Sequence, residues 1–515
     1  MKTQKIIKTA VLMVAMTVSE HIESTVNGKS FFSVASHGRL TLAQYIGLAR
    51  QEVTARTSAG RHLFTAVGFG GQSTHQEDLA RYFLPFNKSK IIVGELGSDV
   101  VLNGEADVIA NYFGIFTGSK PSRSDTVSAK LQEYTFSSEV SFAPQQTFAG
   151  VNFSYRYHIS QELDRGIWFA LDVPIVWVRN TIGLEEQVLA SGGLGGHNPQ
   201  VPDNTPGTMT AAFKQPSWLF GKIDGSRSDG GLADMRMRFG WTTFRCPEYH
   251  LESCLGVIFP TSKKPTSEYL FEPIYGNNDH AGIVMAASVG FQVWCQQSCD
   301  RSLYWELDTA GSTFASNQQT RSIDLKNNVW SRYMWVYKNE NARDLTPGIN
   351  VFTQLVTVDA GSSRDLNTAF MYRSGRFLAE TGYHFFGREA EKITLVKSWQ
   401  EGPAIAAIID ESNQFIMGGV SRNRATINNY QGVDNDCTGR PICTDTYRPI
   451  QECDLDLNSA AHPAIVAHTV YATLGYRWGD DCRPATVGFG AAYEFGADNT
   501  TLRHWMLWGT CDIAF

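Results

Sequence analysis

The chain has 515 residues, a formal net charge of −7, 43% hydrophobic residues and 18% charged residues. This balance excludes an intrinsically disordered chain, which needs low hydrophobicity and a dense charge load. The mean hydropathy is −0.21, and no apolar run reaches the roughly 18 residues of a transmembrane helix, so a polytopic helical membrane protein is excluded too. The high content of aromatic residues (12%) and the 46 glycines favour strands joined by turns.

The first residues have the pattern of a secretory signal peptide. Lys2, Lys5 and Lys8 form a positive start, Ala10–Val18 is a short apolar stretch, and Ser19 is a tolerable small residue at the cleavage position. The alternative is an amphipathic or buried first helix. Removal of residues 1–19 takes the net charge from −7 to −10. A chain this acidic, without a basic stripe, is a poor binder of nucleic acid.

Residues 20–60 come before the first convincing strand, Leu63–Gly70. Within them, Leu40–Arg50 has the composition of a short helix. Ala43, Ile46 and Gly47 would lie on one compact face of that helix.

Period-2 alternation of apolar and polar residues is the main signal in the rest of the chain. In Thr147–Ser160 the odd positions are mostly apolar, while the even positions include Asn152 and Arg156. Successive side chains of a strand point to opposite faces, so each such run has one apolar and one polar face. Glycines also fall on the polar faces, at Gly150, Gly240, Gly290, Gly488 and Gly490. The other alternating runs are 167–177, 235–241, 283–293, 303–307 and 485–495.

The length of these runs favours a membrane barrel over a soluble sandwich. Alternation alone fits both, because the apolar face can meet either a core or lipid. Soluble strands average about 5–6 residues, whereas about 9–11 residues span a bilayer. The longer runs here, 147–160, 167–177, 283–293 and 485–495, last 11 to 14 residues.

The lengths of the connections point in the same direction. In a barrel with both termini in the periplasm, short periplasmic turns alternate with long external loops. Long segments such as Asn180–Gly231 and Thr261–His280 separate the short ones, and the stretch Trp330–Pro463 is too irregular to follow. The short connections, predicted to lie on one side, are Gln161–Gly166, Pro247–Leu251, Gln296–Asp300 and Gly479–Arg483.

The last strand carries the most specific pattern. In HWMLWGTCDIAF, the alternate positions Trp505, Leu507 and Ile513 lead to a terminal Phe515. This resembles the C-terminal signature of bacterial outer-membrane β-barrels, which the barrel-assembly machinery reads. The resemblance implies an outer-membrane location, contact with lipid and assembly by that machinery. The alternative is a buried last strand of a soluble sheet.

A looser resemblance concerns the ends of the chain. Trp505 and Trp508, preceded by YEFG at Tyr493–Gly496, resemble the close of the fatty-acid transporter type of outer-membrane channel. That family has fourteen strands and an N-terminal hatch inside the barrel. The resemblance therefore implies that residues 20–60 form a plug.

Charged side chains on the polar faces are the candidate functional residues. In a barrel they would line the lumen, where opposed charges tune permeability. The alternative is that they pair across neighbouring strands and only rigidify the wall. The candidates are Arg156, Asp172, Asp234, Arg236, Arg238, Glu306, Asp308, Glu494 and Asp512.

Nine cysteines in an exported chain favour disulfides. No CxxC pair and no histidine at ligand spacing supports a metal site, and no cofactor is expected. The cysteines also resemble those of the major outer-membrane proteins of some intracellular bacteria, whose envelope is cross-linked through disulfides. The disulfide candidates are Cys246 with Cys254 and Cys295 with Cys299, each pair closing a hairpin turn, and in addition Cys437 and Cys443, which fall in one long external loop.

No catalytic constellation is evident. HExxH is missing from the sequence, and GGLGG at Gly192–Gly196 lacks the lysine of a phosphate loop. His158, His384 and His468 are strand histidines with no partner that the sequence identifies. We expect no enzyme.

The sequence thus predicts an all-β protein, with a signal peptide at 1–19, a plug at 20–60 and an antiparallel transmembrane barrel at 61–515. The expected strand number is about fourteen, within a range of about 12–18. The expected function is passive uptake of small molecules across an outer membrane, with apolar solutes preferred. A cysteine-cross-linked structural barrel and a soluble secreted β protein are the alternatives. The oligomeric state is left open.

Overall fold

The structure is a computed structural model. The predicted signal peptide, the predicted helix Leu40–Arg50 and Phe515 lie outside the residues that it describes. The described residues are 26–33, 62–94, 108–109, 113, 136–160, 165–191, 206–246, 248–296, 300–326, 329–338, 345–400, 402–405, 450–479 and 484–514.

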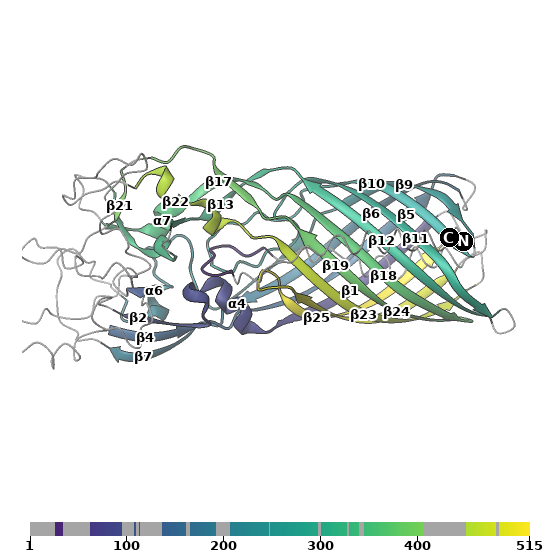
Figure 1. Ribbon diagram of the computed structural model, residues 1–515, viewed down its shortest axis with the longest axis horizontal. Helices are drawn as coiled ribbons and strands as arrows, with labels where there is room; N and C mark the ends of the chain where they lie inside the picture. The colour runs from purple at the N-terminus through teal and green to yellow at the C-terminus, as the bar shows by residue number, and fades with distance from the viewer. Residues whose placement is uncertain are drawn as a thin grey trace, which may run out of the picture.

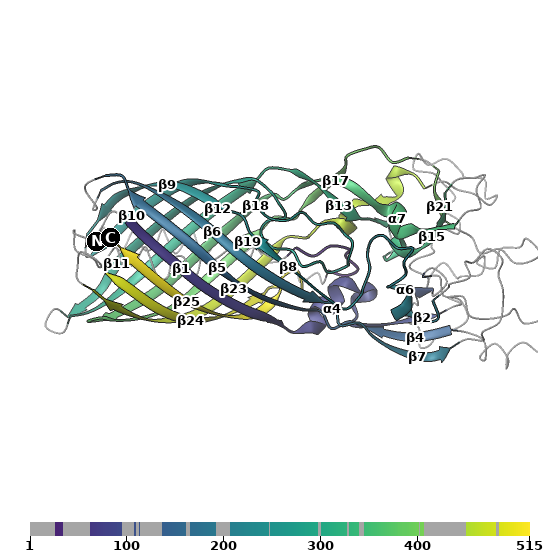
Figure 2. The same ribbon diagram turned by 180° about the vertical axis from the view of Figure 1, so that it is seen from behind.

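Twelve of the described strands close into one antiparallel barrel (Figures 1 and 2). Closure is made by β1, which pairs with β5 on one side and with the last strand, β25, on the other. The barrel strands are β1 (His62–Thr74), β5 (Gln145–His158), β6 (Gly166–Thr181), β9 (Arg236–Arg245), β10 (Tyr249–Ile258), β11 (Gly282–Gln296), β12 (Arg301–Phe314), β18 (Ser362–Ser374), β19 (Phe377–Arg388), β23 (Ile465–Trp478), β24 (Ala485–Gly496) and β25 (Arg503–Ala514).

The apolar face of each strand points outward. On β5, for example, Asn152, Ser154 and Arg156 are buried, while Phe153 between them is exposed. The outward face carries a belt of large apolar side chains. Soluble proteins do not expose so wide an apolar surface to water, whereas a membrane barrel exposes such a belt to lipid. The protein is therefore an outer-membrane type of β-barrel, and the alternative of a soluble secreted protein is wrong. The belt includes Phe64, Ile175, Trp177, Phe239, Trp241, Leu255, Ile283, Met285, Phe370, Leu474, Phe489, Leu507 and Ile513.

The two ends of the barrel differ as the connection lengths predicted. Short turns, including those between β5 and β6 and between β23 and β24, lie at the end that holds Ala514 (Figure 1). The long connections all lie at the opposite end. The turn between β9 and β10 is shorter than predicted, because Tyr249–Leu251 already belong to β10.

Twelve strands is two fewer than the central expectation of fourteen, although it lies within the expected range. The stretch Trp330–Pro463, which the alternation could not follow, supplies only β18 and β19 to the barrel. Its other described strands are two to seven residues long, too short to span the roughly 9–11 residues of a bilayer crossing.

One barrel strand is interrupted. β8 (Ser226–Leu232) pairs with the outer half of β6, and β9 pairs with its inner half. Pro174 lies on β6 between the two halves, where its missing N–H removes a ladder hydrogen bond. Its carbonyl still accepts from the Ala233 amide at 2.9 Å.

Beyond the long-connection end, small sheets form a cap (Figure 2). We use the term cap for Val26–Ser33 together with the described residues of the long connections. Its helices are α4 (Gln76–Phe83), α6 (Met209–Ala212), α7 (Gly348–Phe352) and four 3-10 turns at Pro85–Asn87, Ser331–Tyr333, Glu452–Asp454 and Leu457–Ala460. Its strands are β2 (Lys90–Gly94), β3 (Val108–Ile109), β4 (Phe136–Ser141), β7 (Glu185–Ser191), β13 (Asn317–Ser322), β14 (Asp324–Leu325), β15 (Trp335–Tyr337), β16 (Leu345–Pro347), β17 (Thr353–Asp359), β20 (Lys392–Leu395), β21 (Ala404–Ile405) and β22 (Leu455–Asp456).

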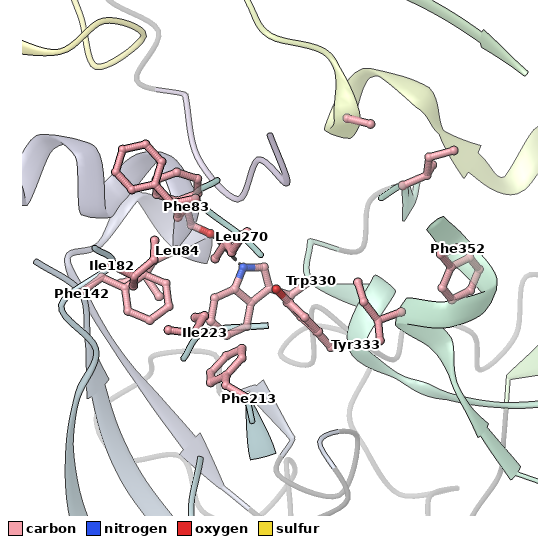
Figure 3. Close-up of a cluster of buried hydrophobic side chains, with 14 of the residues drawn as sticks. Phe83, Leu84, Phe142, Ile182, Phe213, Ile223, Leu270, Trp330, Tyr333 and Phe352 are labelled. Carbon is pink, nitrogen blue, oxygen red and sulfur yellow. Dashed lines mark hydrogen bonds between the residues drawn. The ribbon is translucent and has the colours of Figure 1, made fainter. Parts of the chain in front are cut away.

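The cap has its own hydrophobic core, built from several connections (Figure 3). Trp330 is fully buried at its centre, and its indole N–H donates to the Phe83 carbonyl at 2.8 Å. Phe213 and Tyr333 pack edge-on against Trp330. Burial of so many rings ties connections that are far apart in sequence into one unit.

The segment Val26–Ser33 is an integral part of this cap. The Gly28 amide donates to Leu84 and the Lys29 amide to Tyr82, each at 3.0 Å. Val26 exchanges hydrogen bonds with the side chain of Asn499. Among the described residues, no helix is both long and apolar enough to cross a membrane.

Candidate functional site in the barrel interior

The interior-facing residues of the barrel strands form the candidate site. Of the nine predicted lumen residues, eight lie on barrel strands, at positions that alternate with the exposed apolar residues, and Asp234 lies just before β9. Seven of the nine are buried, and the remaining two, Arg236 and Arg238, are half-buried. They do not gather in a single cluster but lie in separate groups around the wall.

The first group joins three strands of the wall. The Arg156 guanidinium on β5 donates to both carboxylate oxygens of Glu252 on β10, at 3.0 and 3.2 Å. Arg245 forms a second ion pair with Glu252, and Thr242 donates to it at 3.0 Å. β6 and β9 lie between β5 and β10, so Arg156 reaches across two strands, over the ring of Trp168 at 4.0 Å.

The second group is a cross-strand ion pair on β6 and β9. Arg238 contacts Asp172 at 2.9 Å, and Ser154 donates to the same carboxylate at 2.7 Å. Asp172 is almost completely buried, so it depends on these hydrogen bonds. Charged side chains therefore pair between neighbouring strands of the wall here, which is the alternative that the sequence left open.

A third set of carboxylates accepts hydrogen bonds from neutral donors or lies beside a histidine. Asp308 accepts from Ser288 at 2.7 Å and from Asn367 at 3.0 Å. Asp512 accepts from Thr65 at 2.7 Å, across the seam where the last strand meets the first. Two more are Glu306, 3.5 Å from His250, and Glu494, which Thr469 contacts at 3.2 Å.

Asp234 lies at the rim of the barrel, next to the cap. Its carboxylate accepts from the Asn277 amide at 2.5 Å. Burial raises the pKa of Asp234 above its ordinary value, while hydrogen bonds from Ser262 and from the Asn277 amide act in the opposite direction. Arg236 follows at the first position of β9.

Several interior residues are absent from the sequence-based prediction. Glu380 accepts from the Tyr471 hydroxyl at 2.8 Å, and His384 contacts Asp365 at 3.0 Å. These residues lie in and beside β18 and β19, within the stretch that the alternation could not follow. The alternation is nevertheless present, because Glu380 and His384 are buried while Tyr383 between them is only partly so. Glu252 was missed because a turn was predicted next to it.

An apolar patch adjoins the polar groups inside the barrel. It is a cluster of buried side chains from β1, β5, β6, β18, β23 and β25, together with Ala233. Trp508 and Tyr471 pack edge to face with ring centroids 6.4 Å apart. The other members of this interior apolar patch are Val67, Phe69, Phe148, Val176, Val178 and Ala369.

The predicted disulfides of the barrel are not formed. Cys246, Cys254 and Cys295 are free thiols. Cys254 faces the interior opposite Gly240, whereas Cys246 lies at the turn, so the two cannot meet. Cys295 is exposed near the short-turn end of β11, where it lies opposite Ser302 of β12. Cys299, Cys437 and Cys443 lie outside the described residues.

The terminal signature is placed as expected where the structure describes it. Trp505, Leu507 and Ile513 are all exposed on the outward face of β25. Each is thus available to lipid. Phe515 lies outside the described residues.

The cap contains buried charges of its own. Arg321 contacts Glu391 at 3.3 Å, and Glu391 also accepts from the backbone amide of His462 at 2.9 Å. Burial holds the pKa of His462 well below its ordinary value, and the positive charge of the Arg388 guanidinium acts in the same direction. No group of three metal-ligating side chains lies together within the part of the chain that the structure describes.

No protein-family model matches the chain, and no curated protein sequence matches it. Solved structures similar to it include an outer membrane channel from Pseudomonas putida F1, at 7% identity over 89% of this chain and 96% of that one, with a TM-score of 0.38. The toluene transporter TbuX of Ralstonia pickettii and a FadL homologue of Pseudomonas aeruginosa are each 8% identical over 88% of this chain and 89% of theirs, with TM-scores of 0.24. Similarity at these levels says nothing about the solute of this chain.

Proposed function

We propose that the protein is an outer-membrane channel for passive uptake of small, apolar molecules. The interior apolar patch is the observation that carries this proposal. A barrel interior that served only charged or hydrated solutes would gain nothing from eight largely apolar strand residues, whereas an apolar solute is stabilised when it leaves water at such a patch. The neighbouring ion pairs make the rest of the wall polar. An apolar solute gains little free energy from contact with that polar wall, so it binds preferentially at the patch.

Residues 20–60 act as the plug of this channel in our proposal. The described part of this segment, Val26–Ser33, is hydrogen-bonded within the cap, whereas His62 begins β1 at the opposite end of the barrel. The chain therefore has to connect the two ends of the barrel. A route outside the wall would put polar backbone into lipid, where its hydrogen bonds would be unsatisfied.

The test is reconstitution of the full mature chain into liposomes. We expect an apolar fluorescent probe to cross faster than in protein-free liposomes, with little ion conductance in planar bilayers because of the plug. High conductance would support an open pore for hydrated solutes instead. Neither activity, from protein that migrates as a folded barrel in unheated detergent gels, would contradict the proposal.

A structural barrel cross-linked through cysteines is the second candidate. The observation in its favour is that Cys295 and Cys511 are free and exposed, and that Cys511 lies on the outward face of β25. Comparison of reducing and non-reducing gels of whole membranes decides the matter. Disulfide-linked oligomers would favour this candidate, and a monomer in both gels would remove it. We further propose that the barrel-assembly machinery recognises Trp505, Leu507, Ile513 and Phe515.

A further inference from the structure

Glycines on the inner wall of the barrel are paired with bulky rings in a regular way. On the interior face, Trp508 of β25 lies directly opposite Gly490 of β24. A Cβ atom added to Gly490 would lie 2.3 Å from the indole ring of Trp508. The ring therefore occupies the space that a side chain at Gly490 would take, against the neighbouring strand.

The same arrangement recurs around the barrel. In each case the glycine and the ring are direct cross-strand partners, and an added Cβ would come within 2.1–2.6 Å of a ring atom. The other pairs are Phe148 on Gly71, Phe69 on Gly150, Trp168 on Gly240, His250 on Gly290 and Tyr471 on Gly382. Six glycines of the interior face thus each lie opposite one ring on the neighbouring strand. Real Cβ atoms do not approach other atoms so closely, so a larger residue would have to displace the ring. At Gly71 and Gly150 it would also meet a backbone carbonyl oxygen, that of Trp505 and of Ile175.

Outward-facing glycines show no such pairing. Nothing lies within 4 Å of a Cβ atom added to Gly68 on β1 or to Gly311 on β12. The ring-covered glycines are therefore not a by-product of a glycine-rich barrel. They belong to the interior face.

We propose that these six glycines set the bore of the barrel interior. Each gives one ring a seat on the wall, which keeps the bulk of the ring away from the barrel axis. The seated rings then present flat faces, and an apolar solute passes along them. This last point rests on the proposed function, whereas the seating of the rings does not.

Trp168 offers a test that is independent of transport. Its ring lies between Gly240 on the wall and the Arg156 guanidinium, and it packs against the native thiol of Cys254. In a chain in which every other cysteine is serine, Cys254 reports access from the barrel interior. The measured quantity is the ratio of its labelling rates with a bulky maleimide and a small methanethiosulfonate reagent, in folded protein.

We expect Gly240→Ala to lower this ratio, because the displaced ring narrows the bore. Trp168→Ala should raise it, and the double variant should equal Trp168→Ala, because the added methyl group acts only through the ring. Gly311→Ala is the matched control and should equal the parent. The proposal would be overturned if Gly240→Ala left the ratio unchanged. It would also be overturned if Gly240→Ala lowered the ratio equally in the parent and in the Trp168→Ala variant. If Gly240→Ala does not fold, Trp168→Ala alone tests the proposal: a ratio of labelling rates equal to that of the parent would overturn it.

The second arm uses uptake of the apolar probe. Gly490→Ala should slow uptake, Trp508→Ala should accelerate it, and the double variant should equal Trp508→Ala. If the parent protein takes up no probe while the Cys254 ratios behave as expected, the proposed function fails and the bore proposal stands. If the parent protein takes up the probe and Gly490→Ala takes it up at the same rate, the bore proposal fails while the proposed function stands.

Discussion

Glu252 takes part in two of the ion pairs inside the barrel. It accepts from both Arg156 and Arg245, and all three side chains are at most 8% exposed. Its replacement by glutamine would leave two buried guanidinium groups without their carboxylate. We expect Glu252→Gln to lower the free energy of unfolding by about 3 kcal/mol, measured by urea titration in lipid vesicles.

A matched control is provided by the exposed pair of Lys90 and Glu139 in the cap, 3.0 Å apart. Because water screens such a pair, Glu139→Gln should cost about 1 kcal/mol or less. Equal effects of the two substitutions would contradict the assignment of Glu252 to a buried network.

His462 makes the stability of the cap depend on pH. Its pKa is lowered in the folded cap, so the unfolded chain binds a proton more readily. Stability from this group is therefore fully present above the ordinary histidine value of about 6.5 and is lost as the pH falls below it, at up to about 1.4 kcal/mol per pH unit. His280 is shifted in the same direction and adds to the effect.

Proteolysis of the cap in increasing urea measures this dependence, between about pH 5 and about pH 8. We expect protection to fall on the acidic side in the parent chain. In His462→Gln the slope should be smaller, because one of the two titrating histidines is gone. An identical slope in both proteins would show that His462 does not contribute.

At the scale of elements, the outward face of the strands is predicted to lie in lipid. Leu474 on β23 is 57% exposed and Leu219 in the cap is 59% exposed, so the two differ in location and hardly in exposure. Leu474→Arg should destabilise the folded protein in vesicles by about 2–4 kcal/mol. Leu219→Arg, which stays in water, should cost about 0.5 kcal/mol or less. Similar costs at both sites would argue against a membrane-embedded wall.

Much of the barrel could be predicted from sequence because its signal is local. Each strand alternates along its own length, and a one-residue shift would exchange the lipid-facing and interior sides. The phases of β5, β6, β9 and β24 were therefore correct. The interior candidates Asp172 and Asp512 followed from phase alone.

The remainder could not be predicted because it depends on partners far apart in sequence. The contact of Arg156 with Glu252 crosses two strands, and no spacing in the sequence encodes it. The ring seats likewise need the register between strands, since Gly490 and Trp508 become partners only once β24 and β25 are paired. The cap strands are too short for any period to be visible, and its core joins connections from the whole chain.

At the scale of the whole molecule, three features combine in one chain. A lipid-facing belt holds the barrel in the membrane, a hydrogen-bonded interior gives it a polar wall, and in the proposed function the interior apolar patch offers a surface for solutes. The cap closes over the long-connection end, with Val26–Ser33 built into it. Selectivity should therefore depend on charge more than on size, because buried carboxylates and the apolar patch both disfavour an anion.

The most direct test of this account compares two solutes of equal size in liposomes that contain the full mature chain. One is an uncharged aromatic compound and the other is its carboxylate analogue, with protein-free liposomes as the baseline for each. We predict that the protein accelerates passage of the uncharged compound well above its baseline and leaves the carboxylate near its own. Equal acceleration of both, or of neither by protein that is folded in the vesicles, would contradict the account.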